Sequence, residues 1–196
     1  MSMFLFGRIT LEKQLAALAA MDVRMNSGVS ISDFLMSFPR DDFERKPYDL
    51  ILFSLGSEIE SEPWGRYISD DAWNFDLECV DGPGSYRRII ENLLRIAKRP
   101  TLVEDIIDDI TPDATAGELR YTLNGQSQSL EVEVNNDWAD GLTVAILMGE
   151  IADAIGDGRR FWGADNGQAN ILFFLADDQV AKMNRLANNK LKPMAP

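Results

Sequence analysis

Residues 118–134 read ELRYTLNGQSQSLEVEV and give the clearest structural signal in the chain. Two runs of alternating apolar and polar residues flank Asn124 and Gly125. Asn-Gly is the favoured pair for a two-residue type I′ turn, because both positions need a positive φ. Such a turn fixes the strand register and predicts the opposed pairs Leu119–Leu130, Tyr121–Gln128 and Glu118–Glu131. We therefore expect a β-hairpin with one apolar face.

Hydrophobic patterning extends this hairpin into an α+β fold. It predicts further strands at 73–79, 102–110, 159–162 and 169–175, and helices at 85–99, 138–155 and 177–186. The run 169–175 is apolar on both faces, so we expect a central strand. Most neighbouring strands in this order of elements are expected to pair as hairpins. This order favours a mainly antiparallel sheet of about five strands with helices packed on it.

The chain divides by pattern into three parts. Residues 1–56 show helical signals and no strand signal, and residues 57–190 form the α+β part. Residues 191–196 contain two prolines and are expected to be a loose tail. We expect one compact unit overall.

The charge balance limits the kinds of partner. The chain has 32 acidic and 19 basic side chains, a net charge of −13. Nucleic-acid binding needs a positive surface that displaces counterions, and an anionic membrane repels a negative protein. We therefore expect neither partner. A basic protein surface would instead be attracted.

Histidine is missing from the sequence, and Cys79 is the single cysteine. Ser-His-Asp and Cys-His catalysis and imidazole metal sites are therefore excluded. The options left are carboxylate chemistry, Lys or Tyr bases, and metals with oxygen ligands such as Mg²⁺. We assign no catalytic, cofactor-binding or metal-binding residue and expect no cofactor. One cysteine cannot form an intrachain disulfide. Together with the missing signal-peptide and membrane-span patterns, this predicts a cytoplasmic protein.

An acidic region with two aromatic residues is the candidate partner-binding site. Between Glu58 and Asp81 there are eight acids and one base, Arg66. Solubility explains such a region as well as an interface does, although fewer acids would suffice for solubility. The candidate binding residues are Glu58, Glu60, Glu62, Trp64, Tyr67, Asp70, Asp71, Asp76 and Glu78.

Other conspicuous residues have structural interpretations. Asn136 or Asp137 is expected to cap the helix at 138–155, Asp140 to favour its positive N-terminus, and Trp138 to anchor it in the core. The acids at 104–109, with Asp137 and Asp140, are expected to form a solvated strand edge and a helix cap. They also allow a Mg²⁺ or Ca²⁺ site, but their spacing matches no metal loop. A basic helix face is expected to pair with the protein's own acids or to form a homodimer contact, and consists of Arg87, Arg88, Arg95, Lys98 and Arg99.

From about Tyr48 to Leu186 the chain resembles bacterial immunity proteins of polymorphic and type VI secreted toxin systems. The resemblance rests on the order of short segments around the hairpin, namely LFSLGSE (52–58), WNFDLEC (73–79), GSY (84–86), NDWAD (136–140) and GQ (167–168). It implies a non-enzymatic protein that binds its cognate toxin and blocks the active site or the access of substrate. A basic toxin domain is the expected partner by charge.

Two other functions stay open from the sequence. One is a carboxylate-dependent hydrolase that uses Mg²⁺. The other is an adaptor protein that docks through its N-terminal helices.

Overall fold

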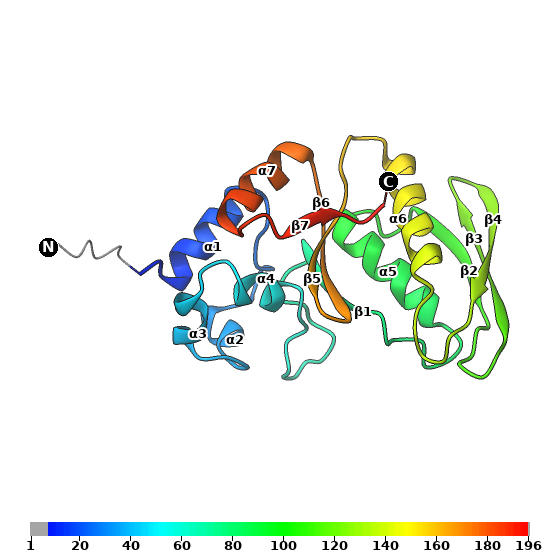
Figure 1. Cartoon of the computed structure of the whole chain (residues 1–196), viewed down its shortest axis with the longest axis horizontal. Helices are drawn as coiled ribbons and strands as arrows, with labels where there is room; N and C mark the ends of the chain where they lie inside the picture. Colours follow the sequence, from blue (N-terminus) through cyan, green and yellow to red (C-terminus); the bar gives the residue numbers. More distant parts are fainter. Residues whose placement is uncertain (1–7, 196) are drawn as a thin grey trace, which may run out of the picture.

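The computed structural model describes residues 8–195 and arranges them in alternating layers of helices and sheets (Figure 1). One outer layer contains the helices α1 (Leu11–Ala19), α2 (Ile31–Phe34), α3 (Arg40–Arg45), α4 (Leu50–Leu55) and α7 (Asp177–Leu186). These helices cover one face of a sheet formed by β1 (Ala72–Asp76), β5 (Arg160–Asn166), β6 (Ala169–Leu175) and β7 (Leu191–Pro193). The next layer holds α5 (Ser85–Ala97) and α6 (Gly141–Ile155). A second sheet completes the stack and consists of β2 (Val103–Asp108), β3 (Ala116–Leu123) and β4 (Gln126–Glu133).

The α+β class and the antiparallel pairing are confirmed. The strands divide between two sheets, however, where the sequence suggested one sheet of about five strands. The four-stranded sheet has the order β1-β6-β5-β7, and the three-stranded sheet has the order β2-β3-β4. The two sheets are separated because α5 and α6 bury apolar side chains on two sides.

The predicted hairpin forms β3 and β4 with the expected register. Leu119 pairs with Leu130, Tyr121 with Gln128, and Glu118 with Glu131. Asn124 and Gly125 have φ values of +50° and +73°, as a type I′ turn requires. The local turn therefore determines the register of these strands.

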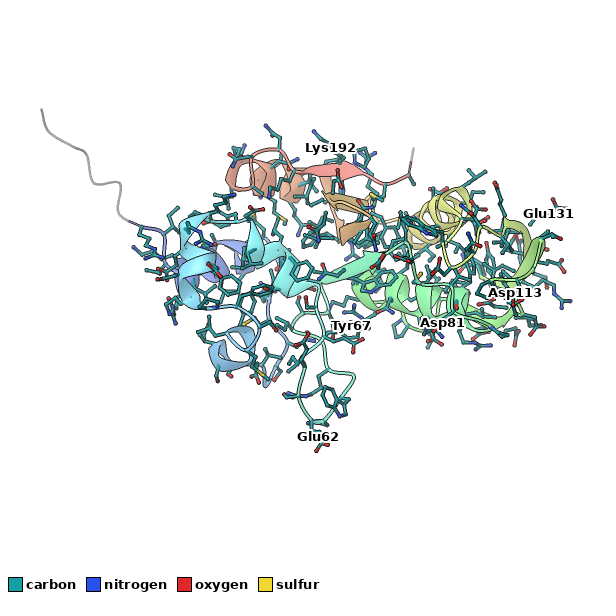
Figure 2. The ribbon with its side chains drawn as sticks, turned by 60° about the horizontal axis from the view of Figure 1, so that its bottom comes forward. Glu62, Tyr67, Asp81, Asp113, Glu131 and Lys192 are labelled. Carbon is teal, nitrogen blue, oxygen red and sulfur yellow. The ribbon has the colours of Figure 1, made fainter. Side chains whose placement is uncertain are left out.

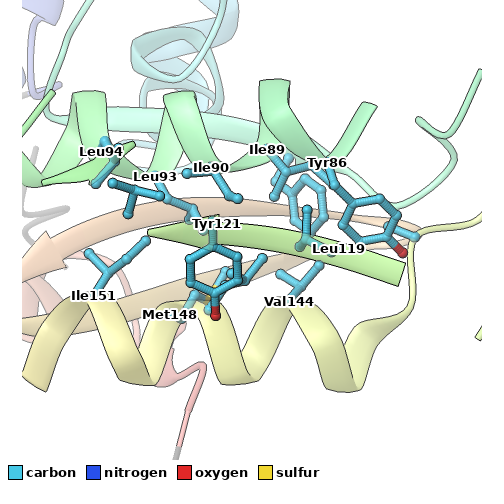
Figure 3. Packing of buried hydrophobic residues seen from close by; sticks show 14 of the residues in the cluster. Tyr86, Ile89, Ile90, Leu93, Leu94, Leu119, Tyr121, Val144, Met148 and Ile151 are labelled. Carbon is cyan, nitrogen blue, oxygen red and sulfur yellow. The ribbon is translucent and has the colours of Figure 1, made fainter. Parts of the chain in front are cut away.

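The core between the two sheets is built on α5 and α6 (Figure 3). Both helices direct apolar side chains toward the hairpin and toward the four-stranded sheet. From the helices the cluster contains Tyr86, Ile89, Ile90, Leu93, Leu94, Val144, Leu147, Met148 and Ile151, and from the sheets it contains Phe75, Leu119, Tyr121, Val132, Phe161, Leu172 and Phe174. A helix that packs against one sheet on each side must carry apolar residues around much of its circumference. The sequences of α5 and α6 both have this pattern.

A second core joins the N-terminal helices to the opposite face of the four-stranded sheet. It unites Leu11, Phe34 and Phe43 with Phe173 and Leu175 of β6. The buried Gln14 connects the N-terminal helices to one another, because its amide donates to the carbonyl of Phe43 and accepts from the backbone N–H of Tyr48. The N-terminal helices and the C-terminal strands therefore share one hydrophobic core.

The prediction of a loose tail at 191–196 is wrong for residues 191–193. Residues 191–193 form β7 and pair with β5. Leu191 is buried in the second core, and the side-chain amide of Asn184 donates to its carbonyl and accepts from its N–H. A buried leucine whose backbone N–H and carbonyl are both bonded holds this short strand, although its last residue is Pro193.

Candidate functional site: a protruding acidic loop

Most of the acidic candidates lie on a loop between α4 and β1 that extends away from the layers (Figure 2). We call residues 57–71 the acidic loop. Its stem is a narrow antiparallel pair, in which Ile59 N–H donates to Arg66 O at 2.8 Å and Ile68 N–H donates to Ser57 O at 3.0 Å. Ile59 and Ile68 are buried in the second core, so the stem is anchored to the body.

The tip of the acidic loop is held from inside by Arg66. Its guanidinium donates to the carbonyls of Pro63 at 2.8 Å and Glu62 at 3.1 Å, and to Ser61 Oγ at 3.2 Å. The one base of the loop is thus occupied by the tip backbone. Trp64 remains 69% exposed.

The base of the acidic loop is fixed to α5 by Arg95. The Arg95 guanidinium carbon lies 3.5 Å from the centre of the Tyr67 ring, a cation–π geometry. The same guanidinium donates to the Ser69 carbonyl at 3.0 Å and pairs with Asp70 at 3.3 Å. Burial raises the pKa of Tyr67, and the nearby Glu58 carboxylate raises it further. Tyr67 and Asp70 therefore serve the loop's own structure.

Asp71 also has partners within the chain. It forms an ion pair with Lys98 at 3.0 Å and accepts a hydrogen bond from the backbone N–H of Arg24 at 2.9 Å. These contacts join the loop base to α5 and to the segment after α1. They leave the Asp71 carboxylate little free capacity for a partner.

Asp76 and Glu78 lie beyond the acidic loop, at the far end of β1. Gln168 donates to both carboxylates, at 3.3 Å to Asp76 and 3.0 Å to Glu78. Gln168 belongs to the β5–β6 turn, so these two acids help hold that turn beside β1. The structure thus divides the nine candidates. It brings four of them together as exposed residues of one loop, namely Glu58, Glu60, Glu62 and Trp64.

A groove beside the loop stem was missed by the sequence analysis. It has a volume of about 190 Å³ and is lined by Asp33, Phe34, Met36, Ser37, Phe38, Phe53, Ser54, Ser57, Glu58, Ile59, Glu60 and Ile68. We call it the α2–α4 groove. Residues from 33–38, 53–54 and 57–68 meet here only through tertiary packing. The sequence carries no local signal for it.

The expectations for the start of α6 need correction. Asp140 is the N-cap: its carboxylate accepts from Leu142 N–H at 2.9 Å and from Thr143 Oγ at 2.7 Å. Burial alone would raise the pKa of Asp140. The hydrogen bonds to its carboxylate outweigh burial and lower this pKa. Asn136 and Asp137 do not cap the helix, because both lie in a turn that Trp138 N–H closes by donating to the Asn135 carbonyl at 3.1 Å, and the Asp137 carbonyl accepts from Val80 N–H. Trp138 is 37% exposed and does not anchor the core.

The remaining acids do not gather into a metal-binding cluster in the part of the chain that the structure describes. Within residues 8–195 no three His, Cys, Asp or Glu side chains gather closely enough to hold a metal ion. Burial raises the pKa of Cys79 to about 11, so its thiol is protonated at neutral pH. In the same part of the chain no helix has the length and apolar character needed to cross a membrane.

The basic face of α5 is paired within the chain to a large extent. Arg88 pairs with Asp81, Arg95 with Asp70, and Lys98 with Asp71, while Arg87 donates to the carbonyl of Ile106. Pairing with the protein's own acids, one of the two expected uses, is thus observed. Arg99 donates to the carbonyl of Lys98.

Comparison with known proteins adds no relative. No protein-family model, no curated protein and no solved structure matches this chain significantly.

Proposed function

We propose that this protein is an immunity protein that binds a cognate secreted toxin domain in the cytoplasm and blocks its active site or the access of substrate. The acidic loop is the element that enters the toxin cleft. The observation that supports this most directly is the exposed Trp64 at the end of a braced, protruding, acidic loop. Binding alone suffices for this activity, so no catalytic group is needed.

The shape of the loop suits inhibition because little of it must become ordered on binding. Arg66 holds the tip and Arg95 holds the base, so the loss of conformational entropy on association is small. A tryptophan at the centre of an interface commonly contributes a large share of the binding free energy. Glu58, Glu60 and Glu62 are exposed on the same loop and give it negative charge, which complements a basic cleft such as that of a nuclease.

Substitution of the tip residue tests this proposal. Trp64→Ala should weaken binding to the toxin domain by about 30-fold, equivalent to roughly 2 kcal/mol for a buried aromatic anchor. Calorimetry with the purified toxin domain measures the change. Co-expression then shows whether the variant still protects cells. The toxin is sought in the gene next to the one for this protein, as a secreted protein with a variable C-terminal domain.

Leu142→Ala is the matched control, because Leu142 is 70% exposed on α6, away from the loop. This variant should bind and protect as the unsubstituted protein does. Equal affinity of Trp64→Ala and the unsubstituted protein would remove the loop from the interface. Failure of every neighbouring toxin domain to bind the unsubstituted protein would remove the immunity function itself.

A further inference from the structure

We propose that the open edge of β4 binds an extended segment of a partner protein that carries Lys or Arg at every second position. The segment adds a fourth strand to the three-stranded sheet. This interaction goes beyond the toxin-binding function and does not rest on it. Figure 2 shows Glu131 of β4 at a different end of the molecule from Glu62 of the acidic loop, so the two surfaces are separate. Free backbone groups, an unblocked edge and local charge support the proposal.

Every second residue of β4 directs its backbone N–H and carbonyl groups away from the sheet. β4 is at the end of the order β2-β3-β4, so only one side of it is paired. Beside a two-residue turn the flanking residues, here Leu123 and Gln126, exchange both backbone hydrogen bonds. Bonding then alternates along the hairpin, so Ser127, Ser129 and Glu131 present their N–H and carbonyl groups at the open edge.

The hydrogen bond at the end of β4 agrees with this alternation. Glu133 is the next residue in it, and its N–H donates to the Asp140 carboxylate at 3.3 Å, away from β3. For Ser127, Ser129 and Glu131, no hydrogen-bond partner of the outward groups lies within residues 8–195. All three residues are exposed, so a further strand can reach them.

The other edge strands carry features that block pairing. β2 has a register shift, and Arg87 from α5 donates to the carbonyl of Ile106. β1 is bonded beyond its sheet, since Asn74 N–H donates to the Gly56 carbonyl at 3.0 Å. β7 has three residues and ends in Pro193, which has no N–H. Such features prevent strand addition, whereas β4 has eight residues, an unbroken register and no proline.

The surface along this open edge is acidic. A hollow of about 1040 Å³ lies beside β3 and β4; no Lys or Arg lines it, and its ionisable residues are Glu118, Glu131, Glu133 and Asp140. Glu118 and Glu131 are directly opposed in the hairpin, which is unfavourable for like charges. Arg120 lies 3.7 Å from Glu118, but no ion pair within the described chain includes Glu131 or Glu133. A cation at this edge would relieve the repulsion.

The same charges decide against a second copy of this chain as the occupant. Two copies of β4 would bring the same acids together, and each chain carries a net charge of −13. A segment with Lys or Arg at every second position instead places cations on the face that carries Glu131 and Glu133, because directly paired residues share a face. Main-chain hydrogen bonds then hold the segment, and its cations provide selectivity.

A designed peptide tests the proposal on the full-length protein without any toxin. Acetyl-KTKVKTK-amide has lysines at alternate positions and β-branched residues between them. Titration into ¹⁵N-labelled protein, followed by NMR, should give saturable shifts at residues 126–133 with a Kd on the order of 1 mM or below. The amide hydrogens of Ser127, Ser129 and Glu131 should exchange with solvent more slowly in the complex.

Two methylated peptides separate strand addition from attraction between charges. In an antiparallel pair, the backbone N–H groups of the two central lysines face β4. Methylation of these two nitrogens should weaken binding about tenfold or more. Methylation of the backbone nitrogens of the valine and one threonine, which face away from β4, should leave the affinity within about twofold. Both peptides have the same charge and the same number of methyl groups.

Variants of the protein test the same contacts from the other side. Ser129→Pro removes one outward N–H and should weaken binding about fivefold or more, while Ser129→Ala keeps this N–H and should bind normally. Glu131→Gln/Glu133→Gln should also weaken binding of the lysine peptide about fivefold or more. The matched control Glu58→Gln/Glu60→Gln removes two charges at the same spacing on the acidic loop and should bind normally. The amide spectrum of each variant reports whether it is folded.

Three results would overturn the proposal. One is the absence of saturable shifts at β4 up to about 10 mM peptide, well above the expected Kd. Another is equal binding of the two methylated peptides, which would mean that charge attraction acts without strand addition. The third is a dimer in sedimentation experiments that forms with the unsubstituted protein and not with Ser129→Pro, since a second copy would then be the occupant.

Discussion

At the scale of single residues, Asp108 shows how one buried acid joins two elements. It is the last residue of β2, yet its carboxylate accepts from the backbone N–H groups of Tyr86 at 2.5 Å and Arg87 at 3.2 Å. These N–H groups belong to the second and third residues of α5, whose own N-cap, Gly84, has no side chain to offer. A carboxylate from another element therefore caps the helix and complements its positive end.

Asp108→Ala should destabilise the protein by about 2–3 kcal/mol, because it leaves buried N–H groups unpaired and removes a cap. Urea unfolding followed by circular dichroism measures the change. Asp109→Ala is the control, since the adjacent Asp109 is exposed and should change stability by less than about 0.5 kcal/mol. Equal stability of the two variants would mean that Asp108 is not a cap.

The burial of Asp108 could not be predicted from the sequence. It belongs to the acidic run 104–109, where a solvated strand edge or a metal site were the two interpretations. Its neighbours Glu104, Asp105 and Asp109 are exposed, as the first interpretation expects, but Asp108 is buried. The difference comes from α5, which approaches β2 only in the folded protein.

At the scale of elements, local signals were sufficient where the turn itself determines the structure. Asn124 and Gly125 gave the register of β3 and β4 residue by residue. The start of α6 was harder to predict, because several capping residues occur within 135–140. Backbone hydrogen bonds hold residues 137–139 beside 77–80, so the helix begins only after Asp140, which caps it. Such pairing is long-range and has no signal in the local pattern.

The strand β7 gives the second stability prediction. Leu191 is 1% exposed, and Leu191→Ala should lower the free energy of unfolding by about 2–3 kcal/mol through the cavity it leaves. Thermal or urea unfolding measures this loss. The adjacent Lys192 is exposed, so Lys192→Ala should have little effect. If truncation of Leu191 is also harmless, β7 contributes no packing and the tail is loose after all.

At the scale of the whole molecule, the division of the strands between two sheets could not be predicted from the sequence. The hairpins β3–β4 and β5–β6 are local, whereas β1 pairs with β6 across almost a hundred residues. Only packing decides that α5 and α6 separate the sheets. For the candidate site, the acids and Trp64 were identified from sequence. Their division into a free loop and paired residues was not, since the partners Arg95, Lys98 and Gln168 lie on other elements.

The net charge of −13 leads to a prediction about kinetics. The association rate with a basic toxin domain should fall about tenfold or more between low and 0.5 M salt, because salt screens long-range attraction. The dissociation rate should change much less. Stopped-flow measurements of the intrinsic tryptophan fluorescence, with the toxin in excess, separate the two rates. An association rate indifferent to salt would show that charge does not guide the encounter.

The shared core of the N-terminal helices and β6 also constrains how the chain folds during its synthesis on the ribosome. The partners of Leu11, Phe34 and Phe43 include Phe173, Leu175, Val180 and Leu191, all from the last part of the chain. During synthesis the first helices therefore emerge long before the strands that cover them, and their apolar faces stay open to other proteins. Nascent chains that stop before β6 expose this surface permanently. They are accordingly the species that chaperones and proteases of the cell would recognise.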